Sequence, residues 1–156
     1  MFIIHARKAL LQGLSPKDNR TIPPLRYPLV YEMQKSFPGL DIILNGGLTD
    51  LKEMKSCVKN RVAGVMIGRE AYENPSLLLN VDNEIFDQKE KVRSMKDVIR
   101  NMIEYCNREK SEGTAINGIL KHLKGAFKGR ANSKEFKRVL FCNETTDSEK
   151  LERLSN

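Results

Sequence analysis

Residues 40–69 read LDIILNGGLTDLKEMKSCVKNRVAGVMIGR. Two mainly apolar runs, 40–44 and 62–67, lie on either side of a segment whose apolar residues recur at helical spacing, which predicts two strands joined by a helix. The first run is almost uniformly apolar, a composition typical of a strand buried in a parallel sheet. Thr49 or Asp50 is suited to cap the intervening helix, with Glu53 placed as its capping-box partner. The stretch therefore predicts one unit of a parallel α/β sheet.

The residues before this stretch extend the pattern toward the N-terminus. A third apolar run, Phe2-Ile3-Ile4, ends at His5, and a helix is expected over residues 25–36 before Pro38-Gly39 stops it. The connection between them, residues 6–24, is polar and unusually long, and connections of this length tend to be functional. The order is thus strand, helix, strand, helix, strand, with a short helix expected after Gly68.

Each predicted strand is followed by residues suited to binding a ligand. Asn45-Gly46-Gly47 follows the second strand, and Gly68-Arg69 follows the third. Glycine lets backbone N–H groups approach an anion, and arginine adds a forked, charge-assisted contact. Two neighbouring strand ends of this kind match the phosphate site after the last two strands of a (β/α)8 barrel. The Asn45-Gly46-Gly47 turn taken alone could equally be a tight structural corner.

Other candidate positions have two readings. His5 could equally be a hydrogen-bonded histidine of the core or a residue that contacts a ligand. Lys17 and Arg20 could equally belong to a solvated loop or contact a large anionic substrate. Three widely spaced cysteines, Cys57, Cys106 and Cys142, form no paired metal-ligand motif, so we expect thiols in a reducing compartment, the cytosol or an organelle matrix. No window is apolar over the length that a membrane span needs.

The C-terminal part of the chain is helical in pattern and basic in charge. We expect helices from Ser94 to near Gly113, over 116–127 and after a Ser133 cap, then a short amphipathic tail, with residues 81–94 as a charged connector. Residues 115–142 hold seven basic side chains against one acidic. Such an excess favours a polyanionic partner, although a solvated basic face has the same composition.

The quoted motifs also carry a family resemblance. FIIHARKALLQGLSPKDNRTIPPL at residues 2–25, followed by ILNGG, GVMIGREAYENP and GRANSKEFKRVL, resembles the tRNA-dihydrouridine synthases, specifically their A-type branch. The resemblance covers nearly the whole chain and is strongest over residues 2–86. It implies the C-terminal part of an FMN-binding TIM barrel, with about three strands, in residues 1–86. A small α-helical tRNA-binding domain would follow in residues 87–156.

The resemblance also implies roles for particular residues. His5 would contact the ring region of FMN, and its phosphate would be held by Asn45, Gly46, Gly47, Gly68 and Arg69. Transfer RNA would be contacted by Lys17 and Arg20, and by Lys134 and Lys137, where the family has arginines. Lysine keeps the charge at these two positions and loses the bidentate fork. The implied reaction is the reduction of D-loop uridines with electrons from NADPH.

The same resemblance implies that part of the enzyme is missing. This chain has no counterpart of two barrel segments, the one with the catalytic cysteine and the one with a lysine beneath the flavin. No residue is therefore assigned a catalytic or metal-binding role. We expect an open sheet edge, no synthase activity from this chain alone, and the missing barrel half as a partner. Two alternatives stay open: an RNA-binding module that has lost catalysis, and a flavin barrel unrelated to RNA.

Overall fold

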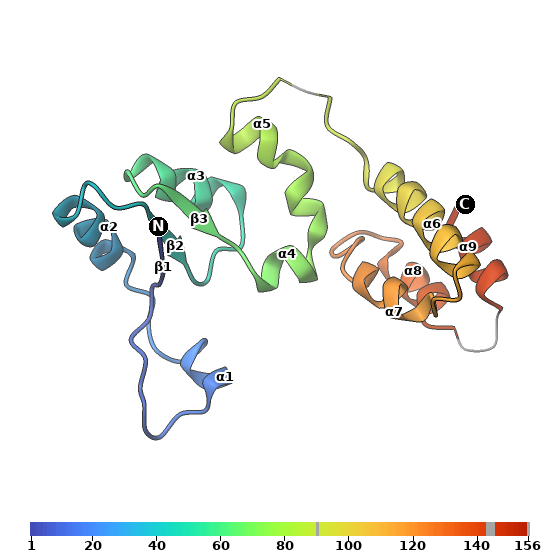
Figure 1. Cartoon of the computed structure of the whole chain (residues 1–156), viewed down its shortest axis with the longest axis horizontal. Helices are drawn as coiled ribbons and strands as arrows, with labels where there is room; N and C mark the ends of the chain where they lie inside the picture. The colour runs from blue at the N-terminus through green and yellow to red at the C-terminus, as the bar shows by residue number, and fades with distance from the viewer. Residues whose placement is uncertain (90, 143–145, 156) are drawn as a thin grey trace. The chain divides into compact units, whose positions relative to one another are not determined.

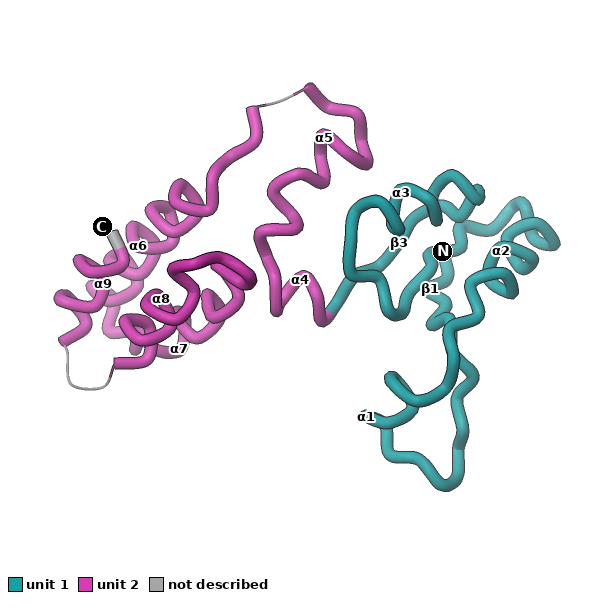
Figure 2. The backbone as a smooth tube through the Cα atoms, turned by 180° about the vertical axis from the view of Figure 1, so that it is seen from behind, with its two compact units in different colours: residues 1–68 teal, residues 69–156 magenta. Residues whose placement is uncertain are grey.

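The computed structural model describes residues 1–89, 91–142 and 146–155 (Figure 1). The chain forms two compact units, Met1–Gly68 and Arg69–Asn156, which Figure 2 shows in different colours. The first contains the sheet and the second is helical.

The sheet of the first unit has the three predicted strands. β1 (Phe2–His5), β2 (Ile42–Asn45) and β3 (Gly64–Met66) pair in parallel in the order β1-β2-β3. β2 begins two residues later than predicted, and the Gln34 amide binds the backbone on both sides of Asp41 at its start. Its Nε2 donates to the Leu40 carbonyl over 2.8 Å, and its Oε1 accepts from the Ile42 N–H over 3.1 Å. The predicted α/β class with about three parallel strands is confirmed.

Two longer helices pack on the sheet. α2 (Tyr27–Ser36) contacts β2, and α3 (Leu51–Lys59) contacts β3. The core between them consists of side chains with almost no exposed surface: Val30, Ile42, Leu44, Met54 and Cys57. The predicted cap of α3 is confirmed at Asp50, whose carboxylate accepts the Glu53 N–H over 2.8 Å.

The strand β1 leaves apolar surface exposed. Phe2 and Ile3 are 53% and 49% exposed, although both lie in a strand of the sheet. A strand that pairs on one side only presents its other edge for pairing, and apolar side chains there are rarely left to solvent. The open edge expected from the sequence is therefore present at β1.

The second unit contains six helices and two 3-10 turns in its described residues (Figure 1). They are α4 (Arg69–Glu73), η1 (Pro75–Asn80), α5 (Val81–Ile85), α6 (Met95–Ser111), α7 (Asn117–Leu120), η2 (Lys121–Leu123), α8 (Ser133–Leu140) and α9 (Asp147–Ser155). α6 starts with a full capping box between Ser94 and Asp97. Its buried stripe packs with Ile116, Leu120, Leu140 and Leu151 into one core. No helix among the residues described is long and apolar enough to cross a bilayer.

Several predicted helix limits in this unit are wrong. The helix expected over 116–127 is broken into α7, η2 and turns, and the connector expected over 81–94 begins with the helix α5. Ser133 is the first residue of α8 and not its cap; Asn132 occupies the cap position, without a side-chain bond to the helix. Phe141, at the C-terminal end of that helix, is 48% exposed.

Contacts within the second unit explain the break. A Cβ built on Gly125 would lie 2.3 Å from the Glu73 carbonyl oxygen, so the backbones of α4 and of the segment after η2 touch directly. Lys128 Nζ lies 3.1 Å from a Glu70 carboxylate oxygen and 3.7 Å from one of Glu73. Residues 69–73 thus pack with the helical unit, and the compact units divide at Gly68. The predicted functional division at residue 86 stays a prediction.

We predict that Gly125→Ala destabilises the chain. Its Cβ would overlap backbone that cannot rotate aside, and overpacking of this kind costs about 1–3 kcal/mol. Gly118→Ala is the matched control, because its Cβ would meet nothing within 4 Å and alanine favours the helix α7. Urea unfolding monitored by circular dichroism measures both. Equal stability of the two variants would contradict the described contact.

Candidate functional site

The predicted cofactor-binding residues at the ends of β1 and β2 lie together at one edge of the sheet. His5 and Asn45 are partners in the register of β1 and β2, and the Ala6 N–H donates to the Asn45 carbonyl over 2.7 Å. A Cβ built on Gly46 would lie 3.1 Å from Cε1 and 3.3 Å from Nδ1 of His5. The His5 ring therefore lies against the turn that follows β2.

Backbone conformation and packing both require glycine in this turn. Gly46 and Gly47 have φ angles of 121° and 71°, which side chains rarely allow. A Cβ on Gly47 would also lie 2.5 Å from Leu25 Cδ1. Leu25, which the sequence reasoning did not single out, thus packs directly on the glycine turn.

Tyr27, a second residue that sequence reasoning missed, holds the turn from another side. Its hydroxyl donates to the Gly46 carbonyl over 2.6 Å. Burial, with smaller contributions from Glu53 and Cys57, raises the pKa of Tyr27 to about 12, so the hydroxyl keeps its proton at neutral pH. Because a trans peptide directs its C=O and N–H oppositely, the Gly47 N–H points away from Tyr27.

Gly68 and Arg69 follow the neighbouring strand. Asn45 pairs with Met66 in the register of β2 and β3, so the chain leaves both strands at the same edge. Gly68 is exposed, and a Cβ there would meet nothing within 4 Å. Arg69 is exposed and begins α4, a helix of only five residues and the first element of the second unit. So short a helix adds little dipole at its N-terminus.

The long connection 6–26 is a structured loop. At its base the Arg26 N–H donates to the Ala6 carbonyl over 2.7 Å, and the Arg7 guanidinium donates to the Pro23 carbonyl. Near its tip the Asn19 amide makes two hydrogen bonds of 2.8 Å with the backbone of Leu10. These contacts, which the sequence reasoning missed, give the loop a defined path.

Lys17 and Arg20 lie at the tip of this loop. Lys17 is on the one-turn helix α1 (Pro16–Asn19), Arg20 caps it, and both side chains are exposed. Figures 1 and 2 show α1 on a loop that extends away from the sheet. The Lys17 and Arg20 side chains are thus exposed to solvent at the tip of a structured loop.

A cationic pocket of about 270 Å³ lies beside His5. Apolar side chains form part of its wall. The other side chains that line it are basic: His5, Arg7, Lys8 and Arg26. Arg7 Nε is buried here without a hydrogen-bond partner in the described structure. An anion near this strand end would meet a favourable field from Arg7, Lys8 and Arg26.

The basic residues of the helical unit divide into paired and solvent-facing groups. Lys128 is paired with Glu70 and Glu73, and Arg138 Nη2 lies 2.7 Å from a Glu135 carboxylate oxygen. The pairs of Lys128 with Glu70 and Glu73 lower the excess charge expected for residues 115–142, whereas Glu135 is already counted in that excess. Lys134 is exposed and Lys137 half-buried, one helical turn apart on α8.

His122 has a structural environment. Its Nδ1 lies 3.1 Å from the Tyr72 hydroxyl, and the two rings meet edge to face with centroids 5.7 Å apart. Both residues belong to the second unit, where they join α4 to η2. The contact accounts for His122 without a role in chemistry.

Two of the three cysteines are sequestered. Cys57 and Cys106 are 1% and 0% exposed, and burial raises the pKa of both thiols. The Tyr31 hydroxyl donates to Cys57 Sγ over 3.3 Å. Neither thiol is suited to exchange protons with a bound substrate. Across the described ranges 1–89, 91–142 and 146–155, no cluster of three metal-ligating side chains occurs.

Comparisons with known proteins add a family to this geometry. A model of the family described as dihydrouridine synthase (Dus) matches residues 1–156. A protein of Escherichia coli O6:H1 (strain CFT073) named tRNA-dihydrouridine(20/20a) synthase is 47% identical over 143 residues, covering 92% of this chain and 43% of its own length. Proteins of the same name from Haemophilus ducreyi and Vibrio cholerae are 44% and 46% identical over 142 residues. Each alignment covers 91% of this chain, and 44% and 43% of the relative. The chain thus spans less than half the length of these relatives.

We predict that iodoacetamide modifies the folded chain at Cys142 well before Cys57 and Cys106. Cys142 is only partly buried, whereas burial and a raised pKa keep the other two thiols inaccessible and protonated at pH 8. Peptide mass spectrometry at timed intervals measures the order. Chain unfolded in urea is the control and should react at all three sites. Equally fast labelling of Cys57 in the folded chain would show that its site is open.

Proposed function

This chain belongs to the dihydrouridine synthase family, and we propose that it forms the C-terminal part of a tRNA-dihydrouridine synthase, an oxidoreductase. The complete enzyme would reduce uridines in the D-loop of tRNA, with FMN as its cofactor and NADPH as the electron donor. From the names of the relatives we propose positions 20 and 20a as the targets. The observation that carries the proposal is the family match over the whole chain together with the glycine turn beside His5.

The strand ends fit the phosphate of FMN. The turn has a backbone that only glycine adopts easily, His5 lies against it, and three cationic side chains, Arg7, Lys8 and Arg26, line the adjoining pocket. We propose that His5, Asn45, Gly46, Gly47, Gly68 and Arg69 hold the cofactor, as the sequence suggested. When bound, the flavin would supply the hydride for the uracil ring. The residues of this chain bind and orient it.

Transfer RNA is the proposed macromolecular ligand. Lys17 and Arg20, on their anchored loop, and Lys134 and Lys137, on α8, would contact backbone phosphates. A flavin at the sheet edge can reach a uracil only if the base leaves its stack in the RNA. Contacts that hold the RNA on both sides of this base are therefore needed.

We do not expect this chain alone to reduce uridine. The catalytic cysteine of the family lies in a barrel segment that has no counterpart in this chain. Cys57 and Cys106 are buried and cannot replace it. The exposed edge of β1 is where we propose that the remaining barrel strands pair, from a preceding segment or from a separate chain. A module that only binds RNA is the second candidate, favoured by the exposed Lys134 and the half-buried Lys137 on α8.

We predict that Lys134→Glu/Lys137→Glu weakens tRNA binding by at least about tenfold and lowers its salt dependence, since each lost phosphate contact reduces counterion release. Filter binding at several salt concentrations measures both quantities. Lys35→Glu/Lys52→Glu makes the same charge change on α2 and α3 and should bind tRNA nearly as the wild type does.

Two results would contradict the assignment. Equal losses of tRNA affinity in the two double variants would mean that binding depends only on the net charge of the chain. Absence of salt-dependent tRNA binding by the wild-type chain would remove the RNA-binding role altogether. Arg69→Ala should leave tRNA affinity unchanged for either candidate. It separates them through FMN affinity, which falls only if the chain holds the cofactor.

A further inference from the structure

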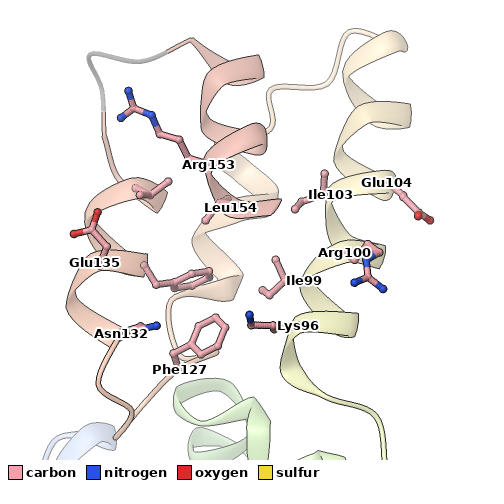
Figure 3. A pocket seen from close by; sticks show the side chains of 12 residues that line it. Lys96, Ile99, Arg100, Ile103, Glu104, Phe127, Asn132, Glu135, Arg153 and Leu154 are labelled. Carbon is pink, nitrogen blue, oxygen red and sulfur yellow. The ribbon is translucent and has the colours of Figure 1, made fainter. Parts of the chain in front are cut away.

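The helical unit contains a pocket that the proposed function does not use. It has a volume of about 550 Å³, within the range of small-ligand sites, and lies among α6, α8 and α9 (Figure 3). Its lining combines apolar and polar side chains: Lys96, Ile99, Arg100, Ile103, Glu104, Phe127, Asn132, Glu135, Phe136, Val139, Arg153 and Leu154. All of them belong to the second unit.

The floor of the pocket is apolar and partly aromatic. Ile99 and Ile103 are 3% and 8% exposed, and Phe127 and Phe136 meet edge to face with centroids 4.7 Å apart. Figure 3 shows Phe127, Ile99 and Leu154 directed toward the same space. A floor of this kind favours the flat ring of a nucleobase, because every base can stack on an aromatic side chain.

Two polar groups point into the same space. Figure 3 shows the Lys96 ammonium and the Asn132 amide on opposite sides of Phe127, while Arg100 and Glu104 lie on the outer side of α6. Asn132 occupies the cap position of α8 but makes no side-chain bond to the helix. Its amide can therefore donate and accept at the edge of a base.

The charges at the pocket favour an anion. Lys96, Arg100 and Arg153 line it against Glu104 and Glu135, and the Glu135 carboxylate is paired with Arg138. Arg100 Nη1 lies 3.4 Å from an Asp97 carboxylate oxygen, so its charge is partly compensated. Lys96, which points inward, is the cation best placed to meet a phosphate.

We propose that this pocket binds one unstacked nucleotide of an RNA ligand. Its base would lie on Phe127, its edge would meet Asn132, and its phosphate would meet Lys96. The inference rests on the proposed function, which makes RNA the ligand, and it adds a nucleotide site separate from the flavin and from the reacting uridine.

The site is also separate from the phosphate contacts proposed above. Asn132, Glu135, Phe136 and Val139 recur at three- and four-residue spacing and line the pocket from one side of α8. Lys134 and Lys137 fall on the other side of the same helix by that spacing. Substitutions can therefore test the two surfaces independently.

The test uses the full chain with its isoleucine methyl groups labelled for NMR, titrated with each of the four nucleoside 5′-monophosphates. The methyl signals of Ile99 and Ile103 should shift and saturate with at least one of them. Phe127→Leu keeps the apolar volume and should weaken binding about tenfold or more, since it removes the stacking surface. Asn132→Ala should also weaken binding or change the preferred base, and because Asn132 makes no cap bond, the helix should persist. Lys52→Met, on α3 and outside the pocket lining, is the control and should bind as the wild type does.

Several outcomes would overturn the proposal. No shift with any of the four nucleotides would do so, as would equal binding by wild type, Phe127→Leu and Asn132→Ala. If Phe127→Leu does not fold, Asn132→Ala decides alone. Transfer RNA binding without nucleotide binding would reject the pocket and leave the proposed function standing. Nucleotide binding that depends on Asn132 without tRNA binding would support the pocket and reject the tRNA role.

Discussion

The packing of Leu25 on the glycine turn after β2 is the contact on which the candidate cofactor site depends. Leu25 belongs to the base of the long loop, where Arg7 and Leu25 form an antiparallel bridge. Its side chain leaves no room for a Cβ on Gly47 and crowds one on Gly46. The loop and the turn therefore fix each other, and the loop that carries Lys17 and Arg20 shares its base with the proposed phosphate site.

The helical unit depends on a second close approach, between Gly125 and the Glu73 carbonyl. It interrupts what would otherwise be a continuous helix after Ile116, and it allows Lys128 to reach Glu70 and Glu73. One consequence is that part of the basic segment is neutralised within the fold. The charges that stay available to a polyanion are then concentrated at fewer positions, among them Lys134 and Lys96.

Local patterns predicted much of this fold. The three strands, the Asp50 cap and the long helix α6 follow from apolar periodicity and capping residues, which act over a few positions of sequence. The break in the helix expected over 116–127 could not be predicted in this way, because this segment packs against the backbone of Glu73, 52 positions before Gly125. Ser133 likewise has the composition of a cap, yet the helix begins one residue earlier than that pattern indicates. The glycine turn was visible in the sequence, whereas Leu25 and Tyr27, which hold it, reach it through tertiary contacts.

Titration of the purified chain with FMN, followed by flavin fluorescence, tests the central claim most directly. If residues 1–69 carry a formed phosphate site, the wild type binds saturably, Arg69→Ala loses that binding, and Arg130→Ala, an equal change of charge elsewhere, retains it. Absence of saturable binding would contradict the account, because the turn held by Leu25 and Tyr27 would then not suffice as a flavin phosphate site. Equal binding by the wild type and Arg69→Ala would also contradict it, by removing Arg69 from the site.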